Sequence, residues 1–394
     1  MKKILVLNSG SSSLKYQLFN VDGDNYQVIA KGKADRIGIH GSFVEIKITG
    51  GEKRSREVAL PTHNEAIAEV TKELLNGALN SMDEIDAVGH RIVQGGDIFK
   101  NSVLVTDTVI DQIEALSELA PLHNHAHVLG IKAVQKLLPN VPQTVVFDTA
   151  FHQTMPKEAY LYALPLEQYT KYKIRRYGFH GTSHAYVSQK AAELIGKKGK
   201  IITCHLGNGA SISAVNNGMC LDTSMGFTPL AGLVMGTRCG DIDPYIPLYI
   251  CKSQNKTPDE VNEILNKKSG MFGLCGYSDN RDIETLYGKE EAATDALNTY
   301  IHSIIRFIGA YIAVLGGVDA IVFTAGIGEN GSLVRKLVVE RLKYLGITLD
   351  EEANNRRGDI AEISTKDSKV RVFVIPTDEE YMIAKDTMQI VFGK

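Results

Sequence analysis

The sequence predicts an α/β protein of two domains that share one duplicated fold, on three observations. Its 394 residues exceed the size at which a single hydrophobic core keeps growing. A strand-like stretch, a turn of Gly and Ser residues and a second strand-like stretch occupy residues 4–19, and the same order recurs at 201–215. Each half later contains a short apolar strand followed by polar residues, at 144–147 and 320–323.

The other elements are predicted from hydrophobic period and turn residues. Period-two alternation predicts a strand at 43–48, and apolar residues at helical spacing predict a helix over 62–75. Thr182 or Ser183 is expected to cap a helix that runs to Leu194. The connection 222–243 is rich in glycine and has little period, which is typical of a functional loop.

Composition excludes several classes of protein. Apolar residues make up 44% and charged residues 23% of the chain, as in ordinary globular proteins, and a net charge of −3 argues against nucleic acid as a partner. Five widely spaced cysteines without a C-x-x-C pair favour free thiols in a reducing compartment. The longest apolar stretch, 307–318, is too short to cross a bilayer and predicts a buried helix. We therefore expect a cytoplasmic protein with no membrane or nucleic-acid partner.

Two glycine- or serine-rich turns are candidate phosphate sites. Backbone N–H groups in the turns at 8–13 and 207–211 could form an anion-binding nest, although such a turn between strands is more often only a hairpin. A further Gly-x-Gly at 326–328, before a helix, favours nucleotide binding. Neither a P-loop nor a Rossmann motif occurs, which argues against those two enzyme classes.

Five charged or polar residues are candidates for chemistry, each with a structural alternative. Arg91 and Arg238 lie near glycines, where a planar guanidinium can clamp an anion or simply form a surface ion pair. Asp148 and Glu379 could belong to a Mg²⁺ site or could cap a turn and a helix. His180 could donate to a phosphoryl group or be a buried structural histidine.

Eight motifs, in family order along the whole chain, resemble the acetokinase (acetate kinase) family. They are Asn8–Lys15, His90–Gly96, Asp148–His152, Gly178–His184, His205–Ser211, Met235–Asp243, Thr324–Asn330 and Pro376–Glu380. The resemblance implies duplicated actin-like (ribonuclease H-like) domains, each a mixed β-sheet flanked by helices, with a nucleotide cleft between them. We expect the N-terminal domain to comprise 1–150 plus 384–394, and the C-terminal nucleotide-binding domain 151–383.

The same resemblance implies roles for individual residues. The implied catalytic residues are Asp148, His180, Arg238 and Arg91, and the implied acetate pocket consists of Arg91, Val93, Leu122, Phe179 and Pro229. The implied ATP-binding residues are Lys15, His205, Leu206, Gly207, Asn208, Gly209, Asp279, Asn280, Arg281, Gly326, Ile327, Gly328, Glu329 and Asn330. Asn8 and Glu379 are implied to hold Mg²⁺, or Mn²⁺ in its place.

The implied activity is reversible, direct in-line phosphoryl transfer from ATP to acetate, which gives acetyl phosphate and ADP, in a homodimeric enzyme. A propionate or other short-chain acyl kinase is one alternative, and an actin- or Hsp70-like ATPase is another from a different class. Gln94 stands where the family usually has histidine, and Cys239 where serine is common, so the preferred acyl chain stays open.

Overall fold

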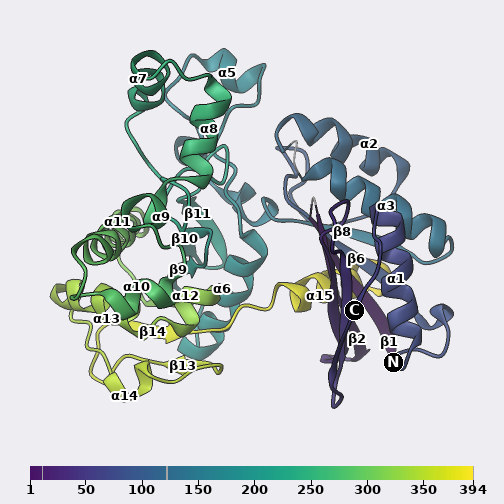
Figure 1. Cartoon of the computed structure of the whole chain (residues 1–394). Coiled ribbons are helices and arrows are strands. Elements are labelled where there is room, and N and C mark those ends of the chain that lie inside the picture. Colours follow the sequence, from purple (N-terminus) through teal and green to yellow (C-terminus); the bar gives the residue numbers. More distant parts are fainter. Residues whose placement is uncertain (11, 121–122, 394) are drawn as a thin grey trace. The chain divides into compact units, whose positions relative to one another are not determined.

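The computed structural model describes residues 1–10, 12–120 and 123–393 (Figure 1). Its contacts divide the chain into two compact units, Met1–Ala150 with the segment from Asp378 onward, and Phe151–Thr377. The chain thus returns to the first unit at residue 378, whereas the sequence placed the return at 384. The reason is that helix α15 (Glu379–Phe392) packs on the first unit's sheet from its first turn onward.

Within the described residues, the first unit contains a sheet of eight strands in the order β5-β4-β3-β2-β1-β6-β8-β7. Strands β1 to β5 pair antiparallel, while β1, β6 and β8 run parallel, so the sheet is mixed as predicted. The strands are β1 Lys2–Ser9, β2 Ser13–Asp22, β3 Asn25–Asp35, β4 Phe43–Ile48, β5 Lys53–Glu57, β6 Ala87–Ile92, β7 Val103–Leu104 and β8 Gln143–Phe147.

Helices cover both faces of this sheet because alternate residues of β1 point to opposite sides. Leu5 and Leu7 belong to the core beneath α1 (His63–Leu75) and α3 (Asn124–Leu137), whereas Ile4 and Val6 pack with α15. A Thr62–Glu65 capping box starts α1 at the predicted residue. The remaining helices of this unit are α2 (Asp107–Ala115) and the 3₁₀ turns η1 (Met82–Glu84) and η2 (Leu116–Glu118).

The second unit repeats the arrangement. In the part of the chain that the structure describes, its sheet has six strands in the order β11-β10-β9-β12-β14-β13, with β9, β10 and β11 antiparallel and β9, β12 and β14 parallel. β9 pairs antiparallel with β10 on one side and parallel with β12 on the other, just as β1 pairs with β2 and β6 in the first unit. The predicted duplication is therefore confirmed. The strands are β9 Lys200–Leu206, β10 Ala210–Asn216, β11 Met219–Thr223, β12 Ala320–Thr324, β13 Ala361–Glu362 and β14 Arg371–Val374.

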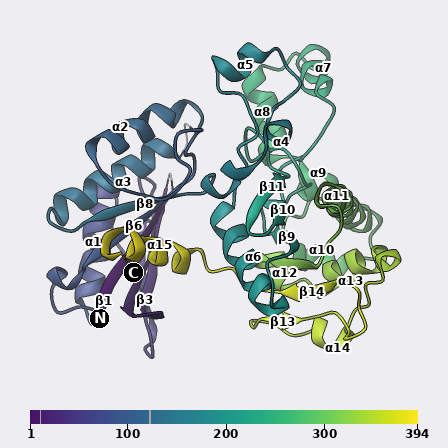
Figure 2. The ribbon, with the colours of Figure 1, turned by 180° about the vertical axis from the view of Figure 1, so that it is seen from behind.

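Two long helices cover this second sheet, α6 (Gly181–Ile195) on one side and α11 (Glu291–Leu315) on the other (Figure 2). The apolar stretch predicted to be a buried helix forms the last turns of α11, but it is buried on one face only: Ile308, Tyr311 and Leu315 are buried, whereas Val314 is 48% exposed. No helix among the described residues is both long and apolar enough to span a bilayer.

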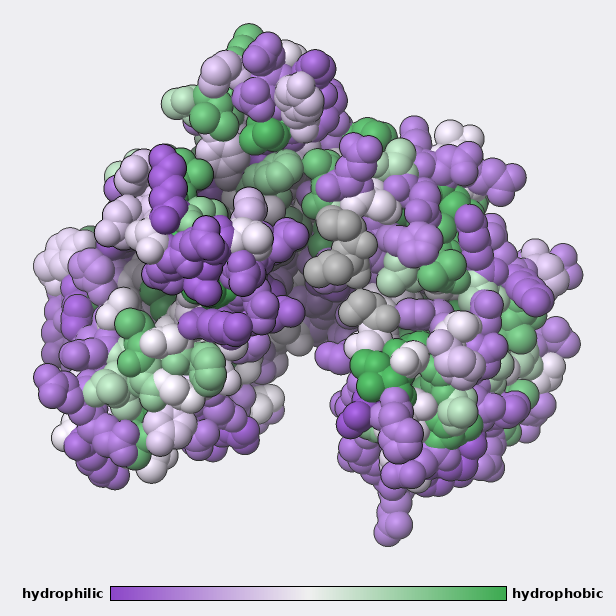
Figure 3. Space-filling view, turned by 45° about the horizontal axis from the view of Figure 1, so that its top comes forward, coloured by the Kyte–Doolittle hydropathy of each residue, from purple (hydrophilic) through white to green (hydrophobic). Residues whose placement is uncertain are grey.

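Shorter helices and a long loop complete this unit. They are η3 Ala150–Thr154, α4 Lys157–Tyr160, α5 Leu166–Thr170, α7 Tyr245–Ser253, α8 Pro258–Lys267, α9 Gly270–Cys275, α10 Asn280–Leu286, α12 Ala325–Asn330, α13 Ser332–Arg341, η4 Lys343–Leu345 and α14 Glu351–Asn354. Residues 224–244 form neither helix nor strand, as the glycine-rich sequence indicated. Helices α5 and α7 carry exposed side chains such as Leu166 and Tyr249. In the space-filling view, hydrophilic residues cover most of the visible face and hydrophobic residues form smaller patches between them (Figure 3).

Candidate active site

A cluster of one arginine and two carboxylates lies at the carboxyl ends of the central parallel strands of the first unit. Asn8 is near the end of β1, Arg91 is in β6 and Asp148 directly follows β8. Arg91 Nη2 lies 2.5 Å and Nε 3.3 Å from the two oxygens of Asp148, and Nη1 lies 3.4 Å from Asn8 Oδ1. Glu379, the first residue of α15, places Oε2 3.8 Å from Arg91 Nε. Neighbouring parallel strands therefore bring these side chains together, as expected at a strand-exit site.

Burial and charge set the ionisation of this cluster. Burial alone would lower the pKa of Arg91, but the carboxylates of Asp148 and Glu379 raise it above its ordinary value. Burial raises the pKa of Glu379 to about 7, although the charge of Arg91 lowers it. Asp148 and Glu380 add to the increase by repulsion. One buried and one partly buried carboxylate beside a single guanidinium form a site that favours one more positive charge.

Lys15, a predicted ATP-binding residue, lies beside this cluster in the first unit. It lies on β2 directly opposite Asn8, and its charge lowers the pKa of Glu379. The sequence assigned Lys15 to ATP, and the structure places it in the first unit among the groups assigned to the metal.

His180 has an unusual backbone conformation in the second unit. Its φ of 57° and ψ of 27° lie in the left-handed region, which costs a residue other than glycine roughly 1 kcal/mol or more. His180 is the N-cap of α6, so the predicted cap at Thr182 or Ser183 was wrong. Both lie in the first turn, and the Ser183 hydroxyl instead bonds His205 Nδ1 at 2.8 Å. The His180 ring stacks on the His205 ring with centroids 4.0 Å apart.

Arg238 lies beside His180 in the second unit. A Cβ atom placed on Gly209 would lie 3.3 Å from Arg238 Nη1 and 3.8 Å from His180 Nε2, so both polar groups face this glycine. Arg238 Nη1 also donates to the carbonyl of Pro229 at 3.2 Å. Burial lowers the pKa of Arg238, which still leaves an arginine fully charged at neutral pH.

The turn at 207–209 is held against the long loop. The Gly236 N–H donates to the Asn208 carbonyl at 3.1 Å, and a Cβ atom on Gly236 would lie only 2.0 Å from Asn208 Oδ1. Glycine is therefore needed at 236 to let the two segments approach.

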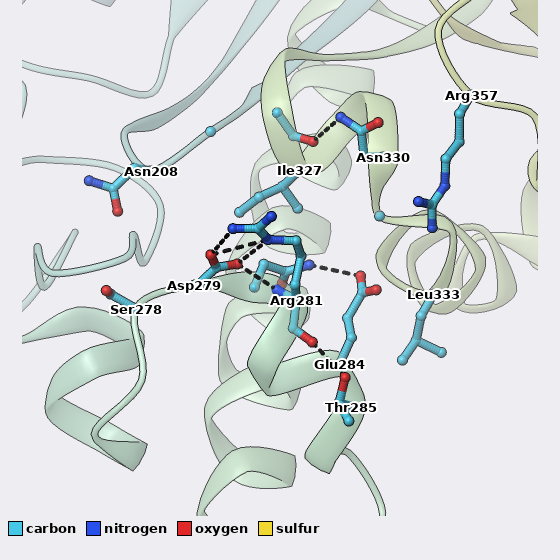
Figure 4. Close-up of a pocket in the computed structure, with 14 residues that line it drawn as sticks. Asn208, Ser278, Asp279, Arg281, Glu284, Thr285, Ile327, Asn330, Leu333 and Arg357 are labelled. Carbon is cyan, nitrogen blue, oxygen red and sulfur yellow. Dashed lines mark hydrogen bonds and ion pairs between the residues drawn. The ribbon is translucent and has the colours of Figure 1, made fainter.

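A pocket of about 1180 Å³ opens beside this turn (Figure 4). It lies between the turn, the start of α10 and the segment of α12 and α13. Eight of its lining residues were predicted to bind ATP, namely Gly207, Asn208, Asp279, Asn280, Arg281, Gly326, Ile327 and Asn330. Figure 4 shows Arg281 paired with Asp279, an ion pair of 2.5 Å. The volume is ample for a nucleotide base and ribose.

Other predicted ATP residues do not line this pocket. They are Lys15, His205, Leu206, Gly209, Gly328 and Glu329. The Glu329 carboxylate instead accepts the backbone N–H groups of Ala325 at 2.8 Å and Thr377 at 3.1 Å. Ala325 has a left-handed φ of 64°, so Glu329 stabilises a strained turn between β12 and α12.

The predicted acyl-pocket residues fall in both units. Val93 follows β6, is buried, and donates its N–H to His127 Nδ1 at 3.4 Å. Phe179 and Pro229 belong to the second unit, where the Phe179 carbonyl accepts from His152 Nε2 at 2.9 Å. Leu122 lies outside the described residues.

The acetokinase family profile matches residues 3–385. The chain belongs to this family. It is 57% identical over 397 residues to an acetate kinase of Halothermothrix orenii, which covers 99% of both chains. It is 55% identical to an acetate kinase of Thermotoga maritima over 99% of this chain and 98% of the relative.

Solved structures agree with this assignment and with the actin-like fold. The crystal structure of Porphyromonas gingivalis acetate kinase superposes with a TM-score of 0.95 at 46% identity, covering 99% of this chain and all of that one. A propionate kinase of Francisella tularensis superposes with a TM-score of 0.93 at 40% identity and the same coverage. The chain is thus similar to solved kinases named for two acyl substrates, and it is an enzyme of the kinase class.

The cluster of the first unit fits the Mg²⁺ that an acetokinase would use. The Asn8 amide oxygen and the Asp148 and Glu379 carboxylates are hard oxygen donors, and one or two such carboxylates suffice for Mg²⁺ bound with a nucleotide. Among the described residues, no three side chains of His, Cys, Asp or Glu form a group suited to a metal.

Sequence reasoning missed six residues that line the pocket of the second unit, Ser278, Glu284, Thr285, Gly331, Leu333 and Arg357. Glu284 had a local signal, because it follows Asn280 by one helical turn and accepts from its Nδ2 at 2.8 Å. Arg357 had none, since it reaches the pocket from a distant loop.

Proposed function

We propose that this chain reversibly transfers a phosphoryl group from ATP to acetate, which gives acetyl phosphate and ADP. The observation that carries the proposal is the partly buried Arg91, of which two nitrogens contact Asp148 while Nη1 makes only a long contact with Asn8. This leaves one edge of the guanidinium for the carboxylate of a small substrate. Family membership over nearly the whole chain supports the same activity.

The chemistry follows from the charges of the reactants. Acetate is already ionised at neutral pH, so its oxygen can attack the γ-phosphorus without a general base, and the electron pair of the broken bond leaves on ADP. The barrier is the approach of one anion to another. In the proposal, Arg91 neutralises acetate, while Arg238 and His180 donate to the transferring phosphoryl oxygens.

Asp148 then serves to hold Arg91, and no acid–base step is required of it. Asn8 and Glu379 would hold Mg²⁺, and Mn²⁺ would suit the same oxygen donors. When bound, the metal ion neutralises charge on the nucleotide phosphates.

The test is ATP-dependent formation of acetyl hydroxamate from acetate and hydroxylamine. Arg91→Ala and Arg238→Ala are each expected to lower kcat/KM for acetate roughly 100-fold or more, because each removes a charged donor. Arg56→Ala is the matched control, since Arg56 pairs with Glu69 and Glu73 at the surface of the first unit. Wild-type protein that hydrolyses ATP but forms no acetate-dependent acyl phosphate would overturn the proposal in favour of an ATPase.

A second acyl substrate is supported by the propionate kinase relative at 40% identity. One methylene in an apolar pocket changes specificity only roughly 10- to 200-fold, so we propose that propionate is a poorer substrate and is not excluded. Steady-state kcat/KM values for acetate, propionate and butyrate decide this, and a larger value for propionate would reverse the order.

We also propose a cytoplasmic homodimer, on the resemblance to the family. The five cysteines, all within the described residues, are free thiols, which suits a reducing compartment. Sedimentation velocity at micromolar concentration would give the mass of two chains, and a monomer mass would contradict the proposal.

A further inference from the structure

His180 is one end of a buried chain of hydrogen bonds that the transfer mechanism does not use. His180 Nδ1 lies 2.9 Å from Ser211 Oγ, and Ser211 Oγ lies 2.8 Å from His184 Nε2. His184 Nδ1 in turn lies 2.7 Å from Thr203 Oγ1. Thr203, His184 and Ser211 each have 0% of their surface exposed. Burying polar side chains between a sheet and a helix costs folding free energy unless each of them has a hydrogen-bond partner.

From this chain, we infer that Ser211 and His184 are positioning residues, which commit His180 Nδ1 to the interior and direct His180 Nε2 to the transferring phosphoryl group. The inference rests on the proposed function, in which His180 touches that group. It gives a new role to Ser211, which the sequence placed only in a candidate phosphate turn, and to His184, which it named only as the end of a family motif.

The geometry supports the assignment of the two ring nitrogens. Whichever way the hydroxyl hydrogens point, Nδ1 of His180 contacts Ser211, so the ring is held with Nε2 on the edge that faces away from Ser211. Nε2 is also the atom that lies beside Gly209, where Arg238 Nη1 approaches. The ring cannot turn over without breaking the bond to Ser211.

His184 makes the chain directional. Burial, with smaller contributions from His152 and His205, holds the pKa of His184 well below the ordinary 6.5, so its neutral ring carries one N–H. When Thr203 donates to Nδ1, the His184 Nε2–H donates to Ser211, and the Ser211 hydroxyl is left to donate to His180 Nδ1. A neutral His180 then carries its proton on Nε2, the tautomer that can donate to a phosphoryl oxygen.

A second arm holds the face of the same ring. His205, stacked on His180, bonds Ser183 Oγ at 2.8 Å, and Ser183 Oγ accepts from Thr377 Oγ1 at 2.8 Å. The titratable or charged groups around His180 are thus His205 from β9, His184 from α6 and Arg238 from the long loop, with His152 beyond His184. Ser211 contacts the edge of the His180 ring and His205 contacts its face, so the effects of the two contacts can be measured separately.

The experiment is a double-mutant cycle of Ser211→Ala and His180→Ala in the full-length chain, with acetyl hydroxamate formation as the assay. Ser211→Ala is expected to lower kcat roughly 10- to 100-fold, as for other groups that orient a catalytic side chain, and to leave KM for ATP within about twofold. In the His180→Ala background the same substitution should have no further effect. The pH dependence of kcat should shift in Ser211→Ala and stay unchanged in the control.

Ser213→Ala is the matched control. Ser213 lies two residues along β10, is equally buried, and bonds Thr223 Oγ1 at 2.8 Å instead of a histidine. It should retain wild-type kcat, which separates the loss of a buried hydroxyl from the loss of the His180 contact. Circular dichroism and ATP titration by calorimetry confirm that each variant is folded.

The outcomes separate the two levels of the argument. If His180→Ala itself leaves kcat unchanged, the proposed role of His180 fails and the inference with it. If His180→Ala lowers kcat while Ser211→Ala matches Ser213→Ala, or adds its full effect in the double variant, only the inference is overturned.

Discussion

A methyl group added at Gly209 is expected to slow phosphoryl transfer without disturbing the fold. Gly209 has no positive φ, so its backbone accepts alanine. The new Cβ atom would lie 3.3 Å from Arg238 Nη1 and 3.7 Å from His180 Cε1. The first distance is tighter than ordinary packing, whereas the second is normal contact, so the guanidinium is the group that must move.

The expected size follows from that movement. A shift of a few tenths of an ångström weakens one charge-assisted hydrogen bond to the phosphoryl group, and such bonds contribute about 1.5–3 kcal/mol. Each 1.36 kcal/mol is a factor of ten in rate, so kcat of Gly209→Ala should fall roughly 10- to 100-fold. KM for acetate should change little, because Arg91, the proposed acetate ligand, is in the other unit.

The assay is steady-state acetyl hydroxamate formation at saturating ATP. Gly309→Ala is the control, since Gly309 lies within α11 and a Cβ there would meet nothing within 4 Å. That variant should keep wild-type kcat and gain roughly 0.5–1 kcal/mol of stability from helix propensity. A Gly209→Ala enzyme with wild-type kcat would refute the reasoning, because it would mean that Arg238 does not act next to this glycine.

Three further changes test the scaffold. Burial lowers the pKa of His90 to about 4. The stability that this histidine contributes at pH 6.5 and above is therefore lost as the pH falls toward 4, by roughly 3 kcal/mol. Urea unfolding at pH 7.5 and at pH 5 should show a smaller loss of stability in His90→Gln than in the wild type. Arg335→Met, which removes buried donors to the Gly328 and Glu329 carbonyls, should cost roughly 3 kcal/mol in the same assay. Calorimetry should find near-native ATP affinity in Glu329→Gln, which keeps an acceptor, and a roughly tenfold weaker affinity in Glu329→Ala.

The sequence predicted most of the fold because its strands and long helices have clear periods. β1 and β9 are apolar runs followed by turns, and α11 has an apolar face over its whole length. Several elements were missed, and for two of them the physical reason is clear. β5, Lys53–Glu57, is an exposed edge strand of charged and polar residues, so it has no apolar alternation. α7 has no buried residue, so no stripe marks a face toward the core.

The site was predicted less completely than the fold. Arg91 and Asp148 could be placed together because parallel strands end side by side, and the Gly207 turn could be placed near Gly326 by the same argument. The chain of hydrogen bonds from His180 to Thr203 could not be predicted, because contacts between one helix and two strands depend on how the helix is aligned with the sheet. Nor could the left-handed His180, because no local signal distinguishes it from a normal N-cap.

A motif fixes where a Cα atom lies, but the direction of its side chain depends on which nearby groups need a partner. The Ala325 and Thr377 N–H groups are satisfied by Glu329, and Arg91 is satisfied by Asp148. Carboxylates that make these bonds hold the site. The Arg281 side chain also has a partner, Asp279, but both residues line the pocket and Arg281 is mostly exposed, so it can meet a ligand. An isosteric replacement that keeps the acceptor should therefore be tolerated at Glu329, while the groups that meet substrate depend on their charge. The predicted site residues thus fall into two groups, those that hold the site together and those that can meet a ligand, and the sequence alone does not separate them.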